Sequence, residues 1–167
     1  MHPHSDCADR RSRGTMAPMS TLDQLTSDLT TAMKARDTQR TGILRQIIGA
    51  VRFEAKAGTV EKELSEDDVL KILAREVKKR RDSAQIYTDA GAAERAATET
   101  TEADLIETYL PAQLSDEELA ALVAAVIADV GASSVRDMGA VMKEATARAG
   151  ASADAKKLST LVRAALS

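Results

Sequence analysis

The sequence predicts an all-α protein, on the basis of its composition and the spacing of its apolar residues. Hydrophobic residues make up 44% of the 167 residues, whereas aromatic residues make up only 2% and there are three prolines. Ala, Glu, Lys and Arg, which favour helices, are abundant. No segment alternates apolar and polar residues as a half-buried strand does. We expect an N-terminal four-helix bundle followed by a small three-helix domain.

Residues 1–18 are expected to form a disordered N-terminal tail. They lack a helical repeat of apolar residues and also the hydrophobic segment of a signal peptide. His2 and His4 lie here, and weak metal binding by them is a less favoured alternative. Cys7 is the single cysteine, so no intramolecular disulfide can form. With no apolar run of roughly 20 residues, these features predict a cytoplasmic protein that does not enter a membrane.

The N-terminal bundle is expected to occupy residues 19–111. Its four helices are expected at about residues 21–35, 38–57, 65–91 and 93–109. Ser65 and Asp68 have the spacing of a capping box at the start of the third helix. Gly58 ends the second helix, and Pro111 stops the fourth.

The C-terminal three-helix domain is expected to occupy residues 112–167. Its helices are expected to start at Ser115, at Ser133 or Ser134, and at Ser152. Glu118 completes a capping box with Ser115, and Gly131 and Gly150 follow the first two apolar stripes as terminating glycines.

The basic segment Lys71–Arg81 is the strongest indication of a binding partner. Six of its eleven residues are Lys or Arg, in a chain whose net charge is −3. On a helix that turns about 100° per residue, four of these cations share one face. They are Lys71, Arg75, Lys78 and Lys79.

Arg80 belongs to the same segment but falls in the middle of the opposite, apolar face. A buried arginine needs an anionic partner. We expect a structural ion pair with Glu102 or Glu99, three residues apart on the fourth helix. Pairing of these carboxylates with Arg40 and their use as metal ligands are the alternatives.

A second row of cations lies on one flank of the second helix, at Arg45, Arg52 and Lys56. If the second and third helices pack side by side, the two rows together suit a phosphate backbone. The alternative is a solvated charged face without a partner. No aromatic residue is interleaved with the cations, so binding is expected to depend on shape and charge and not on base identity.

Residues for catalysis, cofactor binding or metal binding are not predicted. The expected folded part has no histidine or cysteine, and the chain contains neither a GxxxxGK[ST] nor a GxGxxG loop. Glu66, Asp67 and Asp68 cluster at a helix start, where they complement the helix dipole. A binding protein is therefore favoured over an enzyme.

Four stretches of the chain resemble the GatB/YqeY family, over about residues 21–166. They are AMKARDTQRTGILRQIIGAV (32–51), REVKKRRDSAQIYTDAG (75–91), ETTEADLIETYLPAQLSDEEL (99–119) and DMGAVMKE (137–144). The resemblance implies a helical bundle followed by a three-helix domain. Residues 151–157 depart from the family, because alanines replace its frequent glycines, which argues against a close approach of RNA to that loop.

In this family the module is also the tail of the B subunit of the glutamine-dependent tRNA amidotransferase, within the part that contacts tRNA. The resemblance thus implies the label carbon–nitrogen ligase with glutamine as amido-N-donor, although nothing here corresponds to the catalytic cradle of that subunit. We expect a tRNA-binding or amidotransferase-associated module that is not catalytic alone. The alternatives are an amidotransferase component that acts only with partner subunits, and a protein-interaction adaptor that uses the acidic fourth helix or the C-terminal domain.

Overall fold

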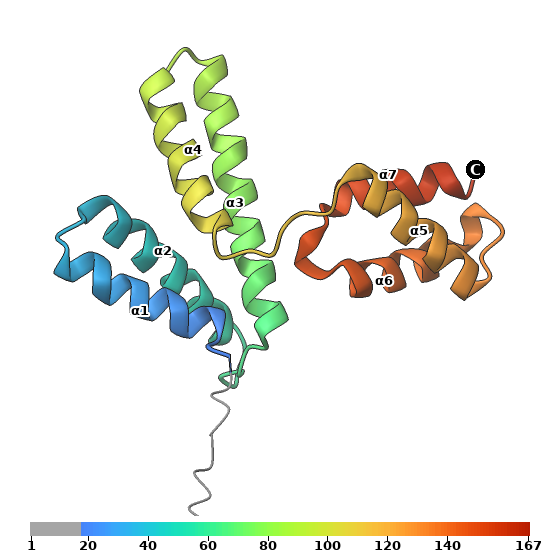
Figure 1. Ribbon diagram of the computed structural model, residues 1–167, viewed down its shortest axis with the longest axis horizontal. Coiled ribbons are helices and arrows are strands. Elements are labelled where there is room, and N and C mark those ends of the chain that lie inside the picture. Colours follow the sequence, from blue (N-terminus) through green and yellow to red (C-terminus); the bar gives the residue numbers. More distant parts are fainter. Residues whose placement is uncertain (1–17) are drawn as a thin grey trace, which may run out of the picture.

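The computed structural model describes residues 18–167, which form seven α-helices and two short 3-10 helices without any strand. The all-α prediction is confirmed. The helices are α1 (Thr21–Lys34), α2 (Thr38–Ala55), α3 (Glu66–Asp89), α4 (Ala93–Glu107), α5 (Asp116–Val130), η1 (Val135–Asp137), α6 (Met138–Ala149), η2 (Gly150–Ser152) and α7 (Ala155–Ala165) (Figure 1). The expected tail, with His2, His4 and Cys7, lies outside the described residues except for Pro18.

The first four helices form two hairpins that splay apart, and the expected four-helix bundle is not confirmed. α1 pairs with α2 and α3 pairs with α4, and the hairpins meet near the α2–α3 connection (Figure 1). Large apolar residues from all four helices are buried there, among them Leu25, Leu44, Ile47, Leu73 and Ile106.

The far part of the α3–α4 hairpin explains this divergence. Beyond Arg80, the only buried residue of α3 is Ala84, and before Ala103 the only buried residue of α4 is Ala96. Such small side chains bring two helices together but offer little apolar surface to a third. The hairpin therefore extends away from α1 and α2.

The last three helices pack around a separate apolar core. It contains Leu119, Val123, Val126, Val141, Ala145, Leu158, Val162 and Leu166. The capping box of Ser115 and Glu118 forms as predicted, and Gly131 ends α5 with a φ of 71°, a conformation that favours glycine. The start of α7 differs from the prediction, because Asp154 and not Ser152 accepts hydrogen bonds from the backbone N–H groups of Lys156 and Lys157.

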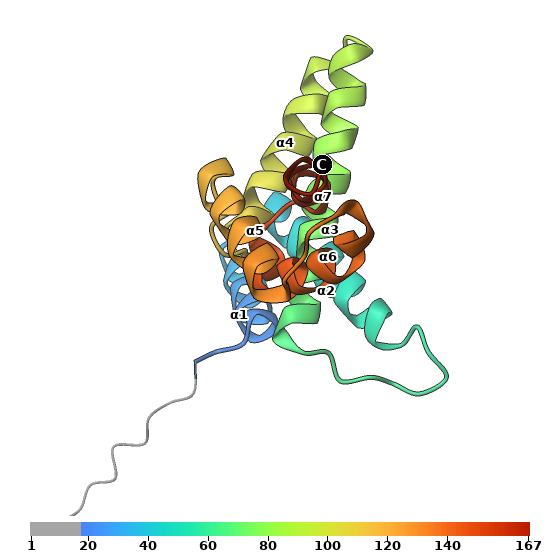
Figure 2. The ribbon, with the colours of Figure 1, turned by 90° about the vertical axis from the view of Figure 1, so that its right-hand side faces the viewer.

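The C-terminal unit is placed against α3 through η2. Two hydrogen bonds attach the link between α4 and α5 to this short helix. Gln113 Nε2 donates to the carbonyl of Ala151 at 2.9 Å, and the backbone N–H of Leu114 donates to the carbonyl of Ser152 at 2.8 Å. The three C-terminal helices are grouped to one side of α3 in Figure 1 and lie in front of it in Figure 2.

Within residues 18–167, no single helix is long and apolar enough to span a membrane. The segments Asp116–Val130 and Val135–Ser152 have sufficient length and apolar composition only when taken together, and they are bent sharply relative to each other.

Candidate nucleic-acid interface

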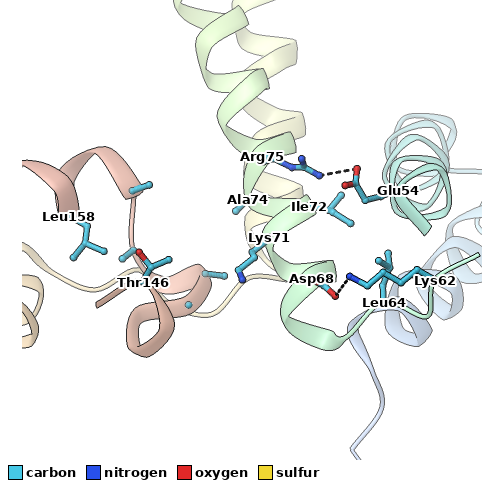
Figure 3. A pocket seen from close by; sticks show the side chains of 14 residues that line it. Glu54, Lys62, Leu64, Asp68, Lys71, Ile72, Ala74, Arg75, Thr146 and Leu158 are labelled. Carbon is cyan, nitrogen blue, oxygen red and sulfur yellow. Dashed lines mark hydrogen bonds and ion pairs between the residues drawn. The ribbon is translucent and has the colours of Figure 1, made fainter. Parts of the chain in front are cut away.

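A cleft of about 490 Å³ lies between the first half of α3 and the η2–α7 segment of the C-terminal unit (Figure 3). Its apolar lining includes Leu64, Ile72 and Leu158, together with four alanines. Its charged lining residues are Glu54, Lys62, Asp68, Lys71 and Arg75. Residues from the 151–157 segment thus face the basic helix α3, which the sequence did not indicate.

The cations of this cleft are already paired with carboxylates. Arg75 Nη2 lies 3.2 Å from Glu54 Oε2, and Lys62 Nζ lies 3.6 Å from Asp68 Oδ2. Lys71 Nζ lies 2.7 Å from the carboxylate of Asp67, one turn earlier on α3. The hydrogen bond to Asp67 raises the pKa of Lys71 above its ordinary value. The cleft therefore has a mainly apolar lining with nearly balanced charges.

A second hollow, of about 510 Å³, opens between α2 and α3 on the other side of the Arg75–Glu54 bridge. α2 contributes Gly49, Ala50 and Phe53 to it, and α3 contributes Lys79. Within residues 18–167, no carboxylate oxygen lies within ion-pair distance of Lys79. This hollow combines a free cation with an aromatic ring.

The other predicted cations divide into a paired and an unpaired group. On α3, Lys78 Nζ lies 3.0 Å from Asp82, so that three of the four cations of this face are paired. On α2 and at its C-cap, three cations are exposed and have no carboxylate partner in the described part of the chain. They are Arg45, Arg52 and Lys56. Arg45 Nη2 instead approaches the Met33 sulfur at 3.8 Å.

The expectation that α2 and α3 would pack side by side holds only over part of their length. The two helices approach each other near the second hollow and then diverge (Figure 1). The two cation rows are therefore not parallel ribbons. Lys79 of α3 borders the second hollow opposite the last turns of α2, but Arg45, Arg52 and Lys56 do not line it.

Arg80 lies on the inner side of α3 and is only 6% exposed. Its Nε donates to Glu102 at 3.1 Å, its Nη1 to Glu76 Oε2 at 2.6 Å, and its Nη2 to Gln46 Oε1 at 2.9 Å. Burial opposes its charge, but hydrogen bonds to Glu76 and Glu102 outweigh burial, and the pKa of Arg80 is raised. The guanidinium thereby links α2, α3 and α4.

The sequence suggested Glu102 or Glu99 as the partner of Arg80. The structure selects Glu102, and Glu76 supplies the second carboxylate. Glu76 lies on α3 itself, four residues before Arg80, whereas Glu99 makes no ion pair with Arg80 among the described residues. The pairing of Glu76 with Arg80 could have been predicted from this spacing, because residues four apart face the same side of a helix.

Arg40 pairs with neither Glu99 nor Glu102. Its Nη2 lies 3.7 Å from Asp28 Oδ2, which also accepts a hydrogen bond of 2.5 Å from the Tyr109 hydroxyl. Burial and the carboxylate of Asp28 raise the pKa of Tyr109 to about 12. This contact connects the end of α4 to α1 and α2.

Phe53 is the residue of the interface that sequence reasoning missed. We expected no aromatic residue among the cations, yet Phe53 is 75% exposed in the second hollow. The sequence could have indicated this residue, because the apolar ring of Phe53 lies between the cations Arg52 and Lys56.

The family described as Yqey-like protein matches residues 22–166 of the chain. A comparison with curated proteins finds no match. Because the family match covers far more than half of the chain, the protein belongs to the family of Yqey-like proteins.

Proposed function

We propose that this protein is a cytoplasmic RNA-binding module whose ligand is tRNA, and that it associates with glutamine-dependent tRNA amidotransferase without catalysing a reaction alone. The observation that carries the proposal is the group of exposed cations without carboxylate partners on α2, at its C-cap and at Lys79 of α3. Within the described residues these are Arg45, Arg52, Lys56 and Lys79.

Free cations matter because phosphate binding gains its free energy from displaced counterions. A lysine that already contacts a carboxylate must give up that contact to bind a phosphate. The unpaired cations do not face this competition. The paired residues Lys71, Arg75 and Lys78 are still exposed and can contribute at the edge of the surface.

A tRNA filter-binding titration at two salt concentrations tests the proposal. With four to six phosphate contacts, affinity should be micromolar or weaker and should fall on the order of a hundredfold or more between about 50 and 200 mM salt. The double variant Lys56→Glu with Lys79→Glu should lose binding while it keeps its helicity, because both side chains are exposed.

The matched control is Lys143→Glu with Arg163→Glu on α6 and α7, which changes the net charge equally at exposed positions of the C-terminal unit. This control should bind tRNA as the wild type does. Equal tRNA binding by the wild type and the Lys56/Lys79 variant would reject the surface and would favour the adaptor alternative. A glutamine-dependent transamidation assay, with and without amidotransferase subunits, should show no turnover that depends on this chain.

A further inference from the structure

Phe53 presents the one freely exposed aromatic ring of the chain. The sequence contains one Phe, two Tyr and no Trp. Tyr87 and Tyr109 are half-buried. The Arg95 guanidinium lies over the Tyr87 ring, 5.8 Å from the ring centroid, and the Tyr109 hydroxyl donates a hydrogen bond to Asp28. Phe53 alone leaves its ring open to a ligand.

The residues beside Phe53 keep one side of the ring uncovered. Side chains on a helix lean toward its N-terminus, so Phe53 lies over the preceding turn. That turn contains Gly49 and Ala50, which also line the hollow. A Cβ atom added at Gly49 would meet nothing within 4 Å. Open space therefore remains at Gly49, within the same hollow as the ring.

Among the described residues that line this space, the one charge without an ion-pair partner is positive. Two carboxylates line the hollow, but Arg75 holds Glu54 and Arg80 holds Glu76. Lys79 has no such partner within residues 18–167, and it faces the hollow from α3. The ligand should thus combine a flat ring with a nearby negative charge.

We infer that the α2–α3 hollow binds one unpaired base of an RNA strand, stacked on Phe53, while Lys79 and the neighbouring cations of α2 hold the adjacent phosphates. The inference rests on the RNA binding proposed above and specifies which part of the RNA is recognised. A base within a duplex has both faces covered by its neighbours, whereas an unpaired base can stack on an aromatic side chain. The hollow should therefore prefer single-stranded RNA to duplex RNA.

Fluorescence tests the stacking directly. Because the chain has no Trp, the variant Phe53→Trp places a single indole in the hollow. Addition of a single-stranded RNA oligonucleotide should quench its emission at the concentrations at which it binds. A blunt duplex with the same number of phosphates should leave the emission nearly unchanged. Equal quenching by both RNAs, or by neither, would overturn the inference.

Affinity measurements provide the second test. Loss of one base stack corresponds to roughly 5- to 150-fold weaker binding. Phe53→Ala should show this loss for the single-stranded oligonucleotide and no loss for the duplex. Gly49→Leu should weaken single-strand binding as well, because its side chain fills the space beside the ring, while the exposed helical position becomes more favourable for helix formation.

The two proposals fail in distinguishable ways. If Phe53→Ala binds single-stranded RNA as tightly as the wild type, while Lys56→Glu with Lys79→Glu still abolishes binding, the base site is wrong and the phosphate surface stands. If the wild type binds neither RNA, both proposals are rejected. If Phe53 serves only to contact a protein partner, Phe53→Ala should bind single-stranded RNA as tightly as the wild type, or the wild type should bind neither RNA.

Discussion

The two faces of α3 carry the same kind of side chain and use it in opposite ways. On the inner face, Arg80 is buried and makes hydrogen bonds to α2, to α4 and to its own helix. On the outer face, Lys79 is exposed and has no carboxylate partner among the described residues. The two residues are adjacent in the sequence, and a rotation of about 100° along the helix separates their roles.

The difference shows that the surroundings, more than the residue type, determine what a cation does in this protein. A buried charge requires partners because desolvation is costly, so Arg80 joins three helices. An exposed charge is stabilised by water and remains available to an external anion. Mutations on the two faces should therefore affect different properties, the free energy of unfolding on one and RNA affinity on the other.

The largest effect should follow removal of the inner cation. Arg80→Ala leaves Glu76 and Glu102 without their partner and should lower the free energy of unfolding by about 3–5 kcal/mol. Lys79→Ala should change it by less than about 0.5 kcal/mol. Urea unfolding of both variants measures the contrast. Equal, small losses would show that the buried network contributes little to stability.

The contact of Tyr109 with Asp28 provides a second inward-facing test, through pH. Its pKa is about 12 in the folded protein and 10.0 ordinarily, so the unfolded chain loses the phenolic proton first. The neutral Tyr109 hydroxyl therefore stabilises the folded protein fully below pH 10, and this contribution to the free energy of unfolding disappears as the pH rises through 12. The wild type should lose up to about 2–3 kcal/mol in this window.

Tyr109→Phe serves as the matched variant for this measurement. It cannot titrate at this position, so its free energy of unfolding should fall less between pH 10 and 12 than that of the wild type. The lysines deprotonate in both proteins and cancel in the comparison. Parallel pH curves for the two proteins would contradict a raised pKa.

A smaller effect should distinguish the two groups of cations on the outer surface. Lys56→Gln with Lys79→Gln removes two positive charges. The slope of the logarithm of tRNA affinity against the logarithm of salt concentration should become about two smaller, and the affinity should fall about tenfold. Lys71→Gln with Lys78→Gln should have a weaker effect, because Asp67 and Asp82 already hold these lysines. The reverse order would place the RNA on the cleft side of α3.

The smallest effect is expected at the N-terminus. Residues 1–18 have no helical repeat of apolar side chains, so their deletion should leave the melting temperature unchanged. The truncation must keep Ser20, whose side chain accepts a hydrogen bond from the backbone N–H of Asp23 and caps α1. A fall of several degrees would show that the removed segment contributes to folding.

The sequence alone determined the helical class, most helix ends and the inward position of Arg80. These properties depend on short-range chemistry, since capping pairs such as Ser65 with Asp68 and Ser115 with Glu118 are three residues apart. The pairing of Lys71 with Asp67 and of Lys78 with Asp82 was equally local, at four residues, and could have been predicted in the same way.

Tertiary structure decided the properties that depend on how whole helices are arranged. Periodicity gives the buried face of a helix but not the angle at which another helix meets it. That angle separates the α1–α2 hairpin from α3–α4, brings Glu54 to Arg75 across the helices, and selects Glu102 for Arg80. It also opens the hollow in which Phe53 is exposed beside Lys79, because no side chain from the diverging helices covers the ring.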